Sequence, residues 1–118
     1  MVVRQHPRFR ASFSGTLIHR NQRHAISKSL DLSRKGCRVQ IPFPAFAGMK
    51  VDLQLCLPES NTPIFIQGAV VRWVSSQGIG IEFPSLTSPD QKQLEGTIQR
   101  LEARTAHGRQ QSPLSGNA

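Results

Sequence analysis

Apolar and polar residues alternate along most of the chain between residues 11 and 83, a pattern typical of strands with one buried face. The clearest example is the segment 50–57, in which every second residue from 51 onward is Val or Leu. Similar stretches bounded by Gly, Pro, Asn or Ser predict further strands at 11–19, 25–31, 37–41, 64–74 and 79–83. A polar turn at 20–24 predicts that the first two strands pair as a hairpin. The pattern therefore predicts a mainly β domain with six strands.

A single helix is predicted after the last strand. Ser88 suits the N-cap, Pro89 suits the first helical position, and Gln91 completes a capping box. An apolar stripe follows at helical spacing, at Leu94, Ile98 and Leu101. We expect this stripe to cover an open end of the β domain. From residue 105 the chain is rich in Gly, Ser, Gln and Pro, which predicts a disordered tail over 105–118.

The positive charge of the chain is concentrated in its first half. The 118 residues carry a formal net charge of +8 at pH 7. Residues 1–50 hold ten Lys or Arg and one acid, a net charge of +9, whereas residues 51–118 have a net charge of −1. Such a field favours an anionic partner: a nucleotide phosphate, nucleic acid or an acidic protein face. The alternative is the solvated surface of a basic protein.

Several function classes find no support in the sequence. No apolar run is long enough to cross a bilayer and the N-terminus has no apolar signal region, so we expect a cytoplasmic protein of one domain. Cys37 and Cys56 lack C-x-x-C spacing and are expected to be free thiols. No catalytic constellation and no metal-ligand spacing is present. The chain is therefore expected to bind a ligand rather than to catalyse a reaction, without a metal or a cofactor.

Two short motifs lie in the basic half. Asp31, Ser33 and Gly36 form a D-x-S-x-x-G motif at the turn between two predicted strands. Arg4 and Arg8 form an R-x-x-x-R motif near the N-terminus. A proline between these arginines disfavours a helix, and in an extended chain they would lie about 13 Å apart, far enough to reach two sides of a ligand. Taken alone, this arm would be read as a disordered basic N-terminus.

The two motifs in this order, ahead of a β-rich remainder, resemble the PilZ domain. The runs 68–73 and 78–83 also resemble the last two strands of that family. The resemblance implies an all-β fold, a six-stranded antiparallel β-barrel with a C-terminal α-helix, which binds cyclic di-GMP. It divides the chain into a basic ligand-binding arm at 1–10, a barrel plus helix at 11–104 and a tail at 105–118.

By this resemblance, the ligand-binding residues are Arg4, Arg8, Asp31, Ser33 and Gly36. Two further candidates are Arg38, which is expected to point outward beside the motif, and Trp73, for which packing in the barrel is the alternative. Val3 stands where some relatives carry another arginine, which favours one ligand per domain over a stacked pair.

The resemblance implies a cyclic di-GMP receptor or adaptor that changes conformation on binding and signals to an unidentified partner protein. One alternative is a small basic barrel that binds nucleic acid without sequence preference. That mode uses aromatic stacking platforms, and outward aromatic residues are few here, so nucleic acid is not the expected partner. A second alternative is a PilZ-like interaction module that does not bind nucleotide, against which the intact motifs argue.

Overall fold

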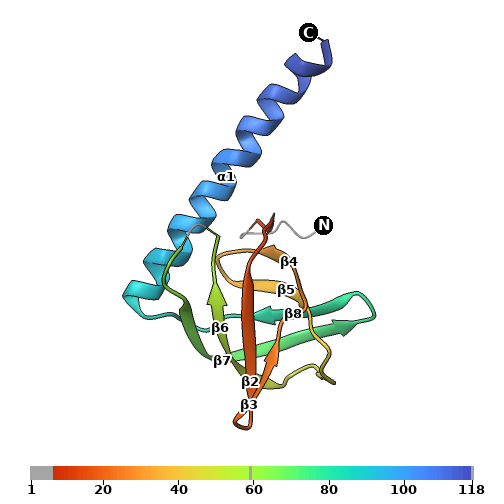
Figure 1. The fold of residues 1–118 in the computed structure, drawn as a ribbon, viewed down its shortest axis with the longest axis vertical. Coiled ribbons are helices and arrows are strands. Elements are labelled where there is room, and N and C mark those ends of the chain that lie inside the picture. The colour runs from red at the N-terminus through yellow and green to blue at the C-terminus, as the bar shows by residue number, and fades with distance from the viewer. Residues whose placement is uncertain (1–6, 59, 118) are drawn as a thin grey trace.

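The computed structural model describes residues 7–58 and 60–117, with side-chain surroundings as far as residue 104. It contains one curved β-sheet followed by one helix (Figure 1). The strands are β1 (Phe9–Arg10), β2 (Ser14–His19), β3 (Gln22–Ala25), β4 (Lys28–Leu32), β5 (Gly36–Gln40), β6 (Lys50–Cys56), β7 (Ile64–Ser75) and β8 (Gly78–Glu82), and the helix is α1 (Ser88–Asn117).

The sheet has eight strands in the order β1-β4-β5-β8-β7-β6-β2-β3, and each neighbouring pair is antiparallel. Within the described residues, β1 and β3 stand at the two ends of this order and do not pair with each other. The predicted closed barrel of six strands is therefore wrong in both strand number and closure. The two additional strands are short, and one of them lies in a polar segment that shows no clear apolar alternation.

The predicted strand at 25–31 belongs to two different strands. β3 forms a hairpin with β2 through a turn in which Arg20 and Asn21 have φ of 51° and 66°. β4, by contrast, pairs with β1 and β5. The Ile26 N–H donates to the Gly15 carbonyl at 3.0 Å and the Ser27 N–H to the Gln40 carbonyl at 2.9 Å, so this link bridges from β2 to β5. Periodicity correctly indicated extended chain but could not identify its partner strands.

The inward side chains of the strands and one face of α1 share a single core. Strands and helix both contribute to the largest fully buried side chains, which are Leu17, Leu32, Leu53, Leu55, Ile64, Ile66, Leu94, Ile98, Val39, Val71 and Thr97. The predicted apolar stripe at Leu94, Ile98 and Leu101 is confirmed. The helix begins at Ser88, which is its first helical residue and not the predicted N-cap. In Figure 1 the first part of α1 lies beside one end of the curved sheet and the helix then leads away from it.

The helical backbone continues to Asn117, although the sequence predicts a disordered tail from residue 105. Ala, Arg and Gln are frequent between residues 103 and 111, and these residues favour helix over other backbone conformations.

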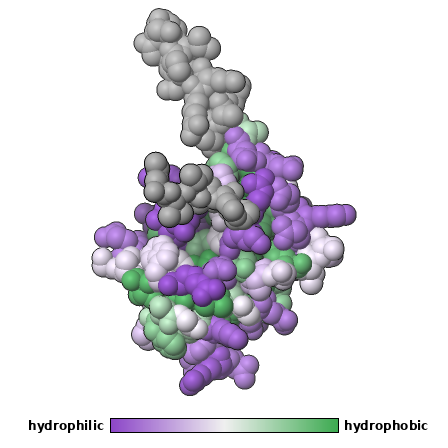
Figure 2. All heavy atoms as spheres, turned by 180° about the vertical axis from the view of Figure 1, so that it is seen from behind, coloured by the Kyte–Doolittle hydropathy of each residue, from purple (hydrophilic) through white to green (hydrophobic). Residues whose placement is uncertain are grey.

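The surface is mostly hydrophilic, and Figure 2 shows polar side chains over most of one face with small apolar areas between them. The large apolar side chains that are exposed in the described residues are Phe46, Phe65 and Val74. Phe46 precedes β6, whereas the other two lie near opposite ends of β7. Scattered apolar residues of this kind are ordinary on protein surfaces and indicate no particular function.

Candidate functional site

The register of five strands places polar residues from distant parts of the sequence in one row. Arg10 of β1 is opposite Asp31 of β4, and Asp31 is opposite Arg38 of β5. Arg38 is in turn opposite Gly80 of β8, which is opposite Trp73 of β7. The two neighbours of Arg38 along β5 are buried, so the row lies on the outer face of the sheet. The row therefore unites Asp31, Arg38 and Trp73, which the sequence had singled out separately.

Asp31 and Arg38 form an ion pair at the centre of the row. The Arg38 Nε and Nη2 groups both donate to Oδ2 of Asp31, whose side chain is only 4% exposed. The other carboxylate oxygen, Oδ1, is buried and has no hydrogen-bond partner among the residues that the structure describes. An unsatisfied buried acceptor costs about 1–3 kcal/mol, so a donor from a ligand or from the basic arm would be stabilising here.

Ser33 shapes the turn that follows Asp31. Its hydroxyl accepts hydrogen bonds from the N–H groups of Lys35 and Gly36, each at 3.1 Å, and donates to the Gly36 carbonyl at 3.3 Å. The Ser33 N–H also donates to the Gly36 carbonyl at 2.8 Å. Ser33 is buried and engaged by its own turn. The hydrogen bonds within this turn explain why a serine stands at position 33. Direct contact of Ser33 with a ligand stays a prediction.

Gly36 is required by the packing of β5 against β8. A Cβ atom built on Gly36 would lie 2.2 Å from the carbonyl oxygen of Ile81, far closer than atoms can approach. The residue pairs with Glu82, so the crowding comes from the neighbouring backbone and not from a mobile side chain. The glycine therefore has a structural reason, whereas its predicted role of letting a ligand approach stays a prediction.

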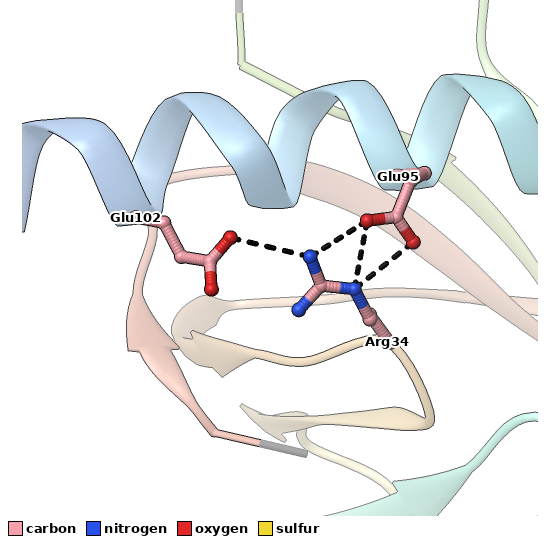
Figure 3. A network of polar contacts seen from close by, with 3 residues as sticks. All are labelled: Arg34, Glu95 and Glu102. Atoms are coloured by element: carbon pink, nitrogen blue, oxygen red, sulfur yellow. Dashed lines mark hydrogen bonds and ion pairs between the residues drawn. The ribbon is translucent and has the colours of Figure 1, made fainter.

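Arg34, which the sequence analysis did not single out, fastens the motif loop to α1 (Figure 3). Its Nε donates to Oε1 and Oε2 of Glu95 at 2.9 and 2.8 Å, and its Nη2 lies 2.6 Å from Oε2. The same Nη2 reaches Glu102 at 3.2 Å. Hydrogen bonding to Glu95 raises the pKa of Arg34 and lowers the pKa of Glu95. No local pattern could reveal this contact, because it joins residues 61 positions apart.

The ion pair predicts a pH-dependent contribution to stability. The pKa of Glu95 is lower in the folded chain than in the unfolded chain. Ionised Glu95 therefore stabilises the fold fully above the unfolded pKa of about 4.3, and this stabilisation is lost as the pH falls through the pKa of the folded chain. We expect the wild type to exceed Glu95→Gln in free energy of unfolding by roughly 0.2–1 kcal/mol at pH 7, as for other partly exposed pairs. Urea unfolding of both proteins at pH 7 and pH 3 measures the difference.

The difference should shrink toward zero at pH 3. Lys92→Met, a charge change on the exposed side of the same helix, serves as the control and should leave the pH dependence of the wild type intact. An equal gap between wild type and Glu95→Gln at both pH values would show that this ion pair does not stabilise the fold.

A groove of about 870 Å³ opens beside the row. Three cations, Arg10, Lys28 and Arg38, line it, and no acid is present among its described lining residues. The remaining polar lining is uncharged and consists of Ser12, Ser14, Ser27, Ser29, Gln40 and Gln77. Small-molecule sites have volumes of roughly 300–1,000 Å³ and use a few convergent polar groups. The groove therefore suits a small anionic ligand with additional hydrogen-bonding groups.

Ser29 holds one wall of this groove in place. Its hydroxyl accepts a hydrogen bond from the Phe13 N–H at 3.1 Å and donates to the Ala11 carbonyl at 2.9 Å. The segment between β1 and β2 is thereby tied to β4. The sequence analysis missed Ser29 because a single serine in an alternating strand carries no distinguishing pattern.

The predicted arm is only partly described. Arg4 lies outside the described residues, and Arg8 is exposed immediately before β1. Arg8 precedes Arg10, which lines the groove, by two residues. Trp73 is half-buried at the far end of the row, where a Cβ on Gly80 would lie 2.3 Å from its indole. Trp73 therefore packs against Gly80 of β8, and it is not among the residues that line the groove.

The described residues show no metal site and no membrane-spanning helix, and the buried thiol among them is unreactive. No group of three or more His, Cys, Asp or Glu there could hold a metal ion. Cys37 and Cys56 are free thiols, as predicted. Burial raises the pKa of the Cys37 thiol to about 12, which keeps it protonated and unreactive. None of the helices in the described part is long and apolar enough to cross a membrane.

The sequence matches one protein-family model, and the structure is similar to solved structures. The family model of the PilZ domain matches residues 3–100. Two solved structures are similar, each with a TM-score of 0.71: the Bacillus subtilis inhibitor of motility (MotI/DgrA), at 21% identity, and the K. pneumonia MrkH–c-di-GMP complex, at 22% identity. The matches cover 92% and 90% of this chain but 54% of each of those chains, so this chain spans about half their length. Among curated proteins no match was found.

Proposed function

The chain belongs to the PilZ domain family, and we propose that it is a receptor for cyclic di-GMP, which it binds in the groove beside Asp31 and Arg38. The observation that carries the proposal is the cationic groove itself. It is lined by Arg10 and Arg38, the two strand partners of Asp31, whereas Asp31, Ser33 and Gly36 are not among its lining residues. Arg10 also follows the R-x-x-x-R motif by two residues. The groove that suits an anion therefore adjoins the D-x-S-x-x-G motif and the described end of the arm, which supports the proposal.

The chemistry of the groove fits the two phosphates and two guanine bases of this ligand. Arginine offers a planar set of donors that pairs with phosphate oxygens or with guanine O6 and N7. We assign this role to Arg4, Arg8 and Arg38. The unpartnered Oδ1 of Asp31 is an acceptor for the N1–H and N2–H₂ groups of guanine. Ser33 and Gly36 contribute by holding the loop in shape, with direct contact to the ligand as a further part of the proposal.

We further propose that the chain acts as an adaptor and not as an enzyme. Ligand binding would hold the part of the basic arm that precedes β1 against the groove, and the new surface would contact an unidentified partner protein in the cytoplasm. The similar K. pneumonia MrkH structure is a complex with c-di-GMP, and the similar B. subtilis protein is an inhibitor of motility, which supports a signalling role for this fold.

Calorimetric titration tests the ligand. We expect cyclic di-GMP to bind with a stoichiometry of one per chain, and in preference to GTP, cyclic GMP or single-stranded DNA. Val3, in place of an arginine ahead of the motif, is the reason for expecting one ligand. The absence of heat with cyclic di-GMP at high micromolar protein, together with salt-sensitive DNA binding, would favour a non-specific nucleic-acid function instead.

A further inference from the structure

A second polar row crosses the groove beside the row that contains Asp31 and Arg38. Lys28 of β4 is opposite Gln40 of β5, and both line the groove together with Gln77 of the β7–β8 turn. Gln40 is two residues from Arg38 along β5, so it faces the same outer side, about 6.8 Å away. Neither family motif includes these three residues.

The Gln40 side chain is held in a defined orientation. Its Nε2 donates to the Gln77 carbonyl at 3.0 Å, which leaves the amide oxygen as an acceptor. The backbone beneath it is also fixed, because the Ser27 hydroxyl and the Ser27 N–H both donate to the Gln40 carbonyl at 2.9 Å. Lys28 is exposed and has no ion-pair partner in the described residues. The second row thus offers a positioned acceptor beside an available cation.

One apolar residue lies between the two rows along β4. Leu30 lies at the bulge where the β4–β5 register shifts, and it is one of the residues that line the groove. Its Cδ1 approaches Gly78 so closely that a Cβ there would lie 3.2 Å away. The groove therefore has two sets of polar residues, Arg10 with Arg38 and Lys28 with Gln40 and Gln77, and Leu30 lies between the two sets on β4. This arrangement matches a ligand made of two like halves.

We infer that Lys28 and Gln40 bind the second nucleotide half of cyclic di-GMP, while Asp31 and Arg38 bind the first. This inference rests on the proposed function. Lys28 would contact a phosphate, and the amide oxygen of Gln40 would accept from the N1–H or N2–H₂ group of the second guanine. Adenine presents an acceptor at N1 and lacks the 2-amino group, so Gln40 selects guanine at this position.

Cyclic GMP–AMP, which carries one guanine and one adenine, tests this selection directly. Its guanine can occupy the Asp31 row, which leaves adenine for Gln40. Calorimetry should show that wild type binds cyclic di-GMP about tenfold more tightly than cyclic GMP–AMP, the effect of one hydrogen bond. Gln40→Met should abolish this preference. The ratio of the two affinities does not depend on the folded fraction, so modest destabilisation of the variant leaves the test valid.

Lys28→Met should weaken both ligands about equally and flatten the salt dependence of binding. Gln67→Met and Lys50→Met, matched changes at exposed positions outside the groove, should bind both ligands as wild type does. If wild type binds cyclic di-GMP and Gln40→Met retains the full guanine preference, the inference is overturned while the proposed function stands. If wild type does not bind cyclic di-GMP at all, the proposed function fails and the inference fails with it.

Discussion

Replacing Arg8 with alanine should weaken cyclic di-GMP binding while leaving the midpoint of thermal unfolding nearly unchanged. A lost charge-assisted contact to phosphate typically costs about 1.5–3 kcal/mol, or roughly one to two orders of magnitude in the dissociation constant. Arg8 is exposed and precedes the first strand, and substitutions at such positions usually change stability by less than about 0.5 kcal/mol. Calorimetry and a thermal melt on the same preparation measure both quantities.

Two further variants serve as comparisons for Arg8→Ala. Lys92→Ala removes a positive charge from an exposed position that does not line the groove, and it should bind as wild type does. Asp31→Ala should lose affinity and stability together, because Asp31 is buried and pairs with Arg38. Normal binding by Arg8→Ala would place the ligand elsewhere on the protein. If Arg8→Ala melted far below wild type, the arm would instead contribute to the stability of the fold.

Gly36→Ala should destabilise the protein by roughly 1–3 kcal/mol or more, the usual range for overpacking. The added methyl group would lie 2.2 Å from the Ile81 carbonyl oxygen, and only a separation of β5 from β8 can relieve that contact. Since Gly36 ends the D-x-S-x-x-G motif, weaker ligand binding should accompany the loss of stability. Denaturant unfolding measures the change in the free energy of unfolding.

Gly96→Ala is the matched control for this substitution. A Cβ on Gly96 would meet only the Arg100 side chain, at an ordinary 3.5 Å, and alanine favours the helix by about 1 kcal/mol. We therefore expect the same chemical change to raise stability in α1 and lower it in β5. If Gly36→Ala were as stable as wild type, packing against β8 would not explain the glycine. Its predicted role of letting a ligand approach the backbone would then be the better explanation.

Much of the local structure could be predicted because it depends on local patterns. The alternation at Val51, Leu53 and Leu55 indicates a strand with one buried face whatever its partners are, and all three are buried. The residues of the first turn likewise indicated the start of α1, because a helix start involves only residues within one turn. The cap itself is Thr87 and not the predicted Ser88, since the Gln91 N–H donates to the Thr87 carbonyl at 2.8 Å and the Thr87 hydroxyl donates to the Asp90 carboxylate at 3.0 Å. The two motifs were sufficient to predict the family, which the match over residues 3–100 confirms.

Strand partners and long-range contacts were decided by the tertiary structure alone. Period-two alternation identifies the face of a strand but not its neighbour, so it could not separate β3 from β4 or show that the sheet stays open. The row from Arg10 to Trp73 exists only because the registers of four neighbouring strand pairs coincide. The contact of Arg34 with Glu95 depends on where α1 docks on the sheet. Local sequence determines which backbone form a segment adopts, whereas the shared burial of distant side chains determines which segments meet.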